Sequence, residues 1–176
     1  RGRYHVPMVL RTPYGGGVRA LEHHSESREA YWAHTPGIKT VVPSGPRNAR
    51  GLLVSAIRDP DPVIFYESKA LYRAFREEVP DAEETMPIGQ PQLVKEGKDV
   101  TLISYGAMML PTLEAAVELK NTDGIAAEVI DLLTISPLNE EILIQSAEKT
   151  GRVVVIEINP RTSRSSALAS KASAGS

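Results

Sequence analysis

The 176-residue sequence contains no cysteine, which excludes disulfide bonds and thiolate metal sites. No apolar run approaches the roughly 20 residues that a membrane-spanning helix needs, so we expect no membrane segment. Aromatic residues are few, with two phenylalanines, one tryptophan and six tyrosines, and there is no block of lysine and arginine. Binding to nucleic acid is therefore not expected. These absences agree with a cytoplasmic protein, or with one of the mitochondrial matrix if the source is eukaryotic.

Charge is divided unevenly along the chain, although its net value is only −2. Residues 1–50 hold eight Lys and Arg against three Asp and Glu, together with all four histidines. Residues 51–176 hold twelve Lys and Arg against nineteen Asp and Glu. The basic first part suits an anionic ligand such as a phosphate or a carboxylate. An equally good interpretation is that the two parts are different surfaces of one fold.

Short apolar runs bounded by turn residues alternate with amphipathic segments, and this pattern predicts an α/β fold with parallel sheets and flanking helices. The expected strands cover residues 6–11, 38–42, 63–66, 100–105, 127–131 and 152–158. The expected helices cover residues 26–34, 47–58, 110–120 and 139–149. In the helix over 47–58 we expect Ser44 as the N-cap and Pro46 near the first helical position.

Two α/β pieces are predicted, over residues 1–75 and 93–162. The stretch between them, residues 76–92, is acidic, contains proline and lacks apolar periodicity, which is typical of a linker. Residues 163–176 are small, polar and low in complexity, and we expect them to form a tail.

The best candidate for chemistry is Glu22–Ser27 (EHHSES), which follows the glycine run Gly15–Gly17. Imidazole is the side chain best suited to move protons near neutral pH. The alternative for these histidines is a loop position bonded to the backbone. Glu26 and Ser27 are expected to cap the helix that begins there.

Eight segments in one order cover residues 6 to 162: PMVLRTPYGGG, EHHSES, AHTPGIKTVVPSGPRNARGLL, SAIRDPDPVIFYE, LYRAFREEVP, KEGKDVTLISYGAM, AEVIDLLTISPL and EKTGRVVVIE. In these eight segments and their order, the chain closely resembles the beta subunits of the thiamine-diphosphate-dependent 2-oxo acid dehydrogenases, within the transketolase superfamily. The resemblance implies the second half of a pyrimidine-binding domain over residues 1–75. It also implies part of a transketolase C-terminal domain over residues 93–162.

The chain departs from the family at both ends. In the family, the glutamate that contacts the aminopyrimidine of the cofactor lies in a segment before the first matched residue, so it is absent here. Ile156 stands where the family usually has histidine, and Ser163–Ser166 replaces a glycine-bearing segment. We therefore expect that the 176 residues alone are inactive.

By resemblance, His24 matches the active-site histidine of the beta subunit. Its expected role is to stabilise or protonate the substrate oxygen and to assist acylation of the lipoyl group. Ala56, Asp59 and Asp61 match positions where the family often holds a potassium ion through main-chain carbonyls. The alternative for these three is an ordinary Asp-Pro helix stop.

The same resemblance implies thiamine diphosphate and magnesium, held mainly by a separate alpha subunit in an alpha2-beta2 heterotetramer. It also implies docking to the lipoyl-bearing second component of the complex. The expected activity is decarboxylation of pyruvate or of branched-chain 2-oxo acids. The alternatives are a fragment of a transketolase or deoxyxylulose-phosphate synthase, and a non-catalytic assembly fragment.

Overall fold

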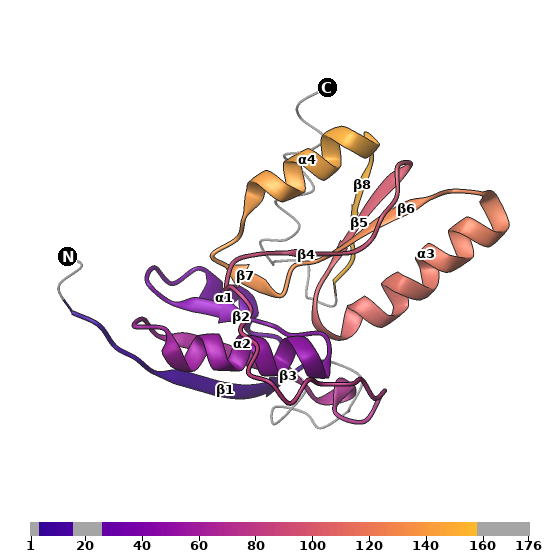
Figure 1. Cartoon of the computed structure of the whole chain (residues 1–176). Coiled ribbons are helices and arrows are strands. Elements are labelled where there is room, and N and C mark those ends of the chain that lie inside the picture. Colours follow the sequence, from indigo (N-terminus) through magenta and orange to yellow (C-terminus); the bar gives the residue numbers. More distant parts are fainter. Residues whose placement is uncertain (1–3, 16–25, 158–176) are drawn as a thin grey trace.

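The computed structural model describes residues 4–15 and 26–157, and it contains two four-stranded sheets with flanking helices (Figure 1). The first sheet has the order β1-β3-β2-β7 and the second has the order β4-β6-β5-β8. Parallel pairs dominate both sheets, which confirms the predicted α/β class. The first sheet comprises β1 (Val9–Tyr14), β2 (Lys39–Val41), β3 (Val63–Ser68) and β7 (Thr134–Ser136). The second comprises β4 (Gln92–Lys95), β5 (Val100–Ser104), β6 (Ala127–Asp131) and β8 (Val153–Val155).

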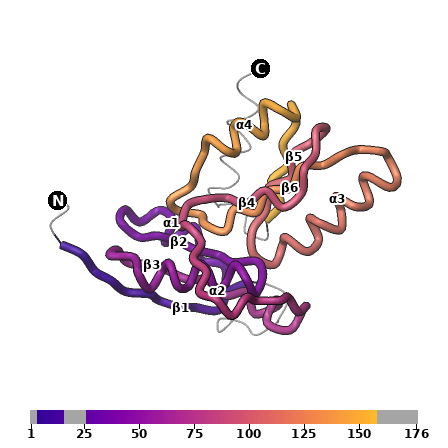
Figure 2. The backbone as a smooth tube through the Cα atoms, in the orientation of Figure 1, coloured from indigo at the N-terminus to yellow at the C-terminus, as the bar shows by residue number. Residues whose placement is uncertain are grey.

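Four α-helices and two short 3-10 turns connect these strands, and Figure 2 traces the chain from the first sheet to the second. The helices are α1 (Glu29–Ala33), α2 (Pro46–Arg58), α3 (Met109–Asp123) and α4 (Glu140–Thr150). The 3-10 turns are η2 (Lys69–Leu71) and η3 (Gly106–Met108). None of the helices in the described part of the chain is long and apolar enough to cross a membrane.

Strand β1 lies three residues later than the sequence predicts, since residues 6–11 were expected and the pairing with β3 runs from Val9 to Tyr14. The shift places Pro13 inside a strand. Because β1 is at the edge of its sheet, a residue without an N–H group is tolerated there.

Helix α2 begins at Pro46, as predicted, but its N-cap residue is Gly45 rather than Ser44. The side-chain oxygen of Asn48 accepts the main-chain N–H groups of Ser44 and Gly45 at 3.1 and 3.0 Å. The capping oxygen therefore comes from inside the helix, and the Ser44 hydroxyl is left for another partner described below.

The two sheets share one hydrophobic core. Tyr14, Val42, Ile64 and Tyr66 from the first part pack with Ile103, Tyr105, Ile130, Leu132 and Leu143 from the second. On the opposite face of the second sheet, Leu102 and Val129 pack against α3, so α3 and α4 cover different faces (Figure 1). The burial of apolar surface between the sheets fixes one against the other.

Two strands were not predicted: β4 is largely exposed, and β7 has one apolar residue between Thr134 and Ser136, so neither forms the short apolar run that marks the other strands. Strand β7 pairs antiparallel with β2, so residues 134–136 leave the second sheet and extend the first. The acidic stretch 76–92 also contacts the first part. Its Glu84 and Glu83 pair with Arg47 and Arg58 of α2 at 2.8 and 2.6 Å.

Candidate active site

The carboxyl edge of the first sheet is where the site is built. Strands β1 and β3 run parallel and end together, with Tyr14 opposite Ser68. The main-chain N–H of Gly15 donates to the carbonyl oxygen of Glu26 at 3.2 Å, so the chain leaves this edge and returns to it at one place. In open parallel sheets, ligands bind outside the carboxyl ends of the strands. His24 lies outside the described residues, and its role stays a prediction.

Helix α1 begins at Glu29, three residues later than predicted. The expectation that Glu26 and Ser27 cap it is wrong, because the N-cap residue is Arg28 and no side chain donates or accepts a capping bond. The carboxylate of Glu26 pairs with Arg28 at 2.7 Å instead. The short helix leaves Glu29 in its first turn, facing the sheet.

Glu29 is the most unusual side chain at this edge. Its residue is only 1% exposed, and neither carboxyl oxygen has a hydrogen-bond partner among the described residues. Burial disfavours the charged form and raises the pKa of Glu29 to about 7; the main-chain N–H of Glu29 itself opposes the rise, and the nearby carboxylate of Glu157 adds to it. A carboxyl group near neutral pKa can hold or release a proton under working conditions. Sequence patterns missed Glu29, because a glutamate in a first helical turn is ordinary.

A small cavity of about 20 Å³ lies beside Glu29. Its lining includes Gly15 and Ser27 at the two ends of the loop and Ser68 at the end of β3. Tyr14 also lines it and meets the ring of Tyr66 edge-on, with the ring centroids 5.4 Å apart. Burial raises the pKa of both tyrosines, so both hydroxyl groups stay protonated near neutral pH.

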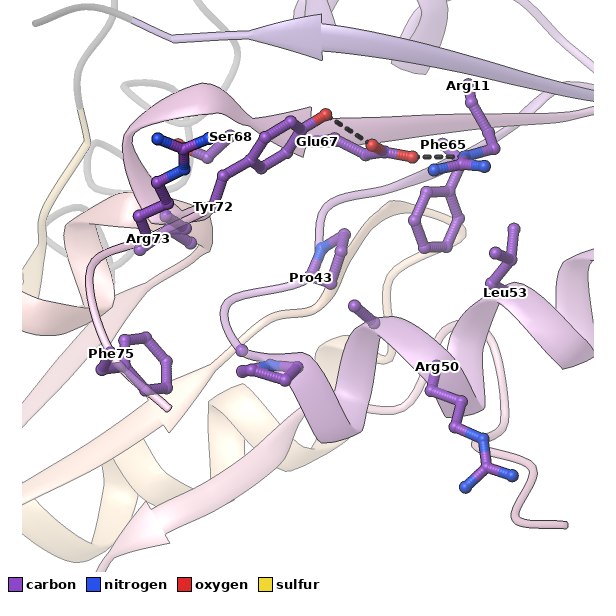
Figure 3. Close-up of a pocket in the computed structure, with 14 residues that line it drawn as sticks. Arg11, Pro43, Arg50, Leu53, Phe65, Glu67, Ser68, Tyr72, Arg73 and Phe75 are labelled. Atoms are coloured by element: carbon purple, nitrogen blue, oxygen red, sulfur yellow. Dashed lines mark hydrogen bonds and ion pairs between the residues drawn. The ribbon is translucent and has the colours of Figure 1, made fainter. Parts of the chain in front are cut away.

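A larger groove of about 550 Å³ lies on the other face of the first sheet, between β3 and α2 (Figure 3). At one side Glu67 accepts hydrogen bonds from Arg11 and, at 2.6 Å, from the Tyr72 hydroxyl. Burial alone would raise the pKa of Glu67, but the bonds from Arg11 and Tyr72 outweigh it and lower the pKa. The rest of the lining is mainly apolar, including Phe65 and Phe75.

The three residues predicted to hold potassium lie at the C-terminal end of α2. The Asp59 N–H donates to the Ala56 carbonyl oxygen at 3.3 Å. The ammonium of Lys39 binds both Asp59 carboxylate oxygens, at 2.7 and 2.6 Å, and lies 3.6 Å from Asp61. One lysine thus pairs closely with Asp59 and loosely with Asp61, so these three side chains together keep one negative charge, while both oxygens of Asp59 are already engaged.

A polar contact joins the two sheets where β6 ends. The Ser44 hydroxyl donates to Asp131 and accepts from the Asn48 side chain at 2.9 Å. The other carboxyl oxygen of Asp131 accepts the N–H of Leu133, which has a left-handed φ of 56°. Burial raises the pKa of Asp131 to about 7, while its two hydrogen bonds oppose the rise. Asp131 was not predicted, although its place at the end of a buried strand was a usable signal.

Two family models match the chain. The transketolase pyrimidine-binding domain matches residues 1–74, and the transketolase C-terminal domain matches residues 89–174. Together the two domain models account for most of the sequence.

Curated relatives are identical to this chain at about half of 156 aligned positions. The pyruvate dehydrogenase E1 component subunit beta of Acholeplasma laidlawii is 50% identical, over 89% of this chain and 47% of the relative. The subunit of the same name from Bacillus subtilis is 51% identical, over 89% of this chain and 48% of the relative. The chain therefore spans about half the length of the curated relatives it matches.

Solved structures give the same fold. A split-gene transketolase, described as an inactive beta4 tetramer, has a TM-score of 0.79 and 28% identity, over 97% of this chain and 55% of that one. A transketolase variant from Pichia stipitis has a TM-score of 0.62 and 17% identity, over 88% of this chain and 23% of that one.

Proposed function

The chain belongs to the transketolase family, and we propose from this premise that it is part of the beta subunit of a thiamine-diphosphate-dependent 2-oxo acid dehydrogenase. The observation that carries the proposal is the identity of 50% to beta subunits named for pyruvate dehydrogenase, sustained over 156 residues. Pyruvate is accordingly the proposed substrate, ahead of the branched-chain 2-oxo acids.

The described residues place buried polar atoms at the carboxyl edge of the first sheet but form no metal site. Neither the Glu29 carboxyl group nor the Ser68 hydroxyl has a hydrogen-bond partner among the described residues. Within residues 4–15 and 26–157, no group of three or more His, Cys, Asp or Glu side chains is arranged to hold a metal ion. We therefore assign magnesium and the diphosphate group to a separate alpha subunit.

Bound thiamine diphosphate supplies the nucleophilic carbon that a 2-oxo acid needs to lose carbon dioxide. The contribution of this chain is to position a proton donor and to exclude water. His24 is the proposed donor, acting on the substrate oxygen and then assisting transfer of the acyl group to the lipoyl group of the second component. Gly15 and Glu26 hold the base of its loop through their 3.2 Å hydrogen bond.

A potassium ion is proposed at the end of α2, held by main-chain carbonyls of Ala56, Asp59 and Asp61. Carbonyls at a helix C-terminus are good ligands for hard cations, and the Ala56 carbonyl, which accepts the Asp59 N–H at 3.3 Å, has a second lone pair for one. Because the Asp59 carboxylate already binds the ammonium of Lys39, its main-chain carbonyl is the better candidate for an ion ligand. A role for the ion is to fix the turn between α2 and β3.

A second candidate function is that of a transketolase-type subunit acting on sugar phosphates. The observation that favours it is the likeness to the split-gene transketolase, which also divides this fold between chains. A third possibility, a non-catalytic assembly subunit, would require a stable complex with an alpha chain but no turnover.

The experiment uses the full-length subunit that contains this chain, co-purified with its alpha subunit. Thiamine-dependent release of carbon dioxide from pyruvate and acetylation of a lipoyl domain are measured for the wild type, His24→Ala and His34→Ala. His34 ends α1 and serves as the matched control. We expect His24→Ala to lose about 100-fold or more in kcat, as for loss of a general acid, and His34→Ala to keep its rate.

Other outcomes distinguish the candidates. Transfer of two-carbon units between sugar phosphates, without decarboxylation of pyruvate, would favour the transketolase function. A stable alpha-beta complex without turnover of either substrate class would favour assembly. An unchanged rate for His24→Ala would remove that histidine from the mechanism.

A further inference from the structure

Buried polar atoms without partners gather on one face of the first sheet. Among the described residues, such atoms belong to Glu29, Thr40, Tyr66 and Ser68. Thr40 is opposite Ile64 in the ladder, and Tyr66 and Ser68 follow Ile64 at alternate positions, so their side chains share a face. Helix α1 covers this face, with Trp32 packed against the same core.

An unpaired carboxyl group in this position is costly. Burying a polar group without a hydrogen bond is unfavourable, and burying a lone charge is far more unfavourable. The neighbouring cation in the chain, Arg28, is paired with Glu26 at 2.7 Å and does not neutralise Glu29. Native structures normally satisfy such groups with a proton, a water molecule or both.

The cavity beside Glu29 has the size for one water molecule. Its volume is about 20 Å³, and a water molecule needs a cavity of about 10–15 Å³ measured in this way. Glu29 and Ser68 both line it, and the side-chain oxygens of both lack partners within residues 4–15 and 26–157. A water bridging them would satisfy a carboxyl oxygen and a hydroxyl group at once.

We propose that this cavity binds one water molecule between Glu29 and Ser68, and that Glu29 acts through it as a positioning residue for the proposed active site. The inference rests on the proposed function for its catalytic part. Gly15 and Ser27, at the two ends of the loop that carries His24, line the same cavity. The bridging water therefore ties the base of the loop to the end of β3.

The state of this site depends on pH. Among the described residues, the titratable groups near Glu29 are Tyr14 of β1, Tyr66 of β3 and Glu157 after β8, and Tyr105 also lines the cavity. The described cation in this region, Arg28, acts on Tyr66 and is paired with Glu26, and the charge of Glu157 opposes ionisation of Glu29. Burial raises the pKa of Glu29 to about 7, so the neutral, ordered form is lost as pH rises through 7.

The water and the proton are tested first, without turnover. A crystal structure of the full-length alpha-beta complex at a resolution that shows water should contain an ordered water within hydrogen-bond distance of Glu29 and Ser68. Infrared difference spectra between wild type and Glu29→Gln should show the carbonyl stretch of a protonated carboxylic acid at pH 6. Absence of the water, or an ionised Glu29 at pH 6, would overturn the proposal.

The positioning role is tested by kinetics of the same complex. Glu29→Gln keeps a polar group beside the water, and we expect near-wild-type kcat at pH 6 without the decline above pH 7. Glu29→Leu removes the bridge, and we expect kcat to fall by about 10-fold or more with KM within about twofold, because misplaced groups mainly lower kcat. The exposed Glu114→Gln is the control.

The two proposals fail in different ways. If the wild-type complex does not decarboxylate pyruvate, the proposed function fails, while the density and the infrared band still decide the water site. If the wild type is active and Glu29→Leu keeps its rate and pH profile, Glu29 is not a positioning residue.

Discussion

Within the described residues, each half of the molecule buries one glutamate, and the two have opposite surroundings. Glu29 of the first part is 1% exposed and Glu128 of the second is 3% exposed. Glu128 accepts from the Ser146 hydroxyl and from the ammonium of Lys149, whereas neither oxygen of Glu29 has a partner among the described residues. Burial therefore does not decide the charge of a carboxyl group by itself; its partners do.

The difference in hydrogen-bond partners also indicates which glutamate stabilises the fold and which belongs to a candidate binding site. The network around Glu128 is complete, since Thr101 links Ser146 and Thr150 through contacts of 2.7 Å. Burial alone would raise the pKa of Glu128, but the bonds from Lys149 and Ser146 lower it below its usual value. A satisfied network stabilises a core, whereas an unsatisfied one at a sheet edge is typical of a place where a ligand or water binds.

The largest expected effect on stability comes from adding a methyl group next to Tyr14, which lines the cavity beside Glu29. Gly106 has a φ of +55°, and a Cβ there would overlap the Tyr14 hydroxyl. We expect Gly106→Ala to lower the free energy of unfolding by about 2–4 kcal/mol, through left-handed strain and overpacking. Urea denaturation measures this. Gly124→Ala, with φ +71° but no neighbour within 4 Å, isolates the strain. Equal losses in both variants would contradict close packing between the sheets.

Removing the charge of Glu128 should lower the free energy of unfolding by less than Gly106→Ala does. Glu128→Gln removes the partner of Lys149, whose side chain is 48% exposed and can reach water. We expect a loss of about 2 kcal/mol, below the usual range for a fully buried pair. Because the folded-state pKa of Glu128 is lowered, this contribution is present above its unfolded pKa and disappears as pH falls through the folded value. Exposed Glu148→Gln is the control, and a similar loss there would refute the role of the pair.

The carboxyl group of Asp131, which joins the two sheets through Ser44, has a raised pKa, as Glu29 does. Its effect on stability should therefore depend on pH in the same direction. Its folded-state pKa is raised from 3.8 to about 7, so the folded state binds the proton more tightly and stability falls as pH rises across that window. Asp131→Asn should remove at most about 1.4 kcal/mol per pH unit from this slope. Thermal unfolding of Asp131→Asn and of exposed Asp123→Asn at pH 5 and 8 measures it. An unchanged slope in Asp131→Asn would show that Asp131 is ionised throughout.

The smallest effect is expected at Glu67, which has hydrogen-bond partners, as Glu128 does, but is less buried than either Glu29 or Glu128. Its side chain is 15% exposed, and it accepts hydrogen bonds from Arg11 and Tyr72. Tyr72 is 53% exposed, so Tyr72→Phe should cost less than about 1 kcal/mol. Loss of the bond should also raise the pKa of Glu67, which an NMR titration of its carboxyl carbon measures. A lower pKa in the variant would contradict the assigned cause.

The alternation of apolar strands and amphipathic helices was enough to predict the α/β class and most element positions. It missed β7, and with it the return of the chain to the first sheet, because this strand has one apolar residue between Thr134 and Ser136 and so forms no apolar run. It misplaced β1 because the pairing register with β3, a tertiary property, sets the strand ends. Glu29 could not be predicted, since its lack of partners arises only when α1 covers the sheet.

The resemblance supplied what periodicity could not, namely a role for His24 and the potassium positions. Those residues are assigned by matching and not by geometry, so they stay predictions. Conversely, Asp131 and Glu29 were found only through burial and contacts in the folded chain.

The most direct test compares Glu29→Gln with Glu128→Gln in the full-length alpha-beta complex, measuring pyruvate decarboxylation per folded protein from pH 6 to 8 together with thermal unfolding. We expect Glu128→Gln to unfold at a lower temperature and keep the wild-type pH profile. We expect Glu29→Gln to keep the wild-type unfolding temperature at pH 6 and lose the decline in rate above pH 7. A changed pH profile in Glu128→Gln, with a wild-type profile in Glu29→Gln, would contradict the assignment of chemistry to the first sheet.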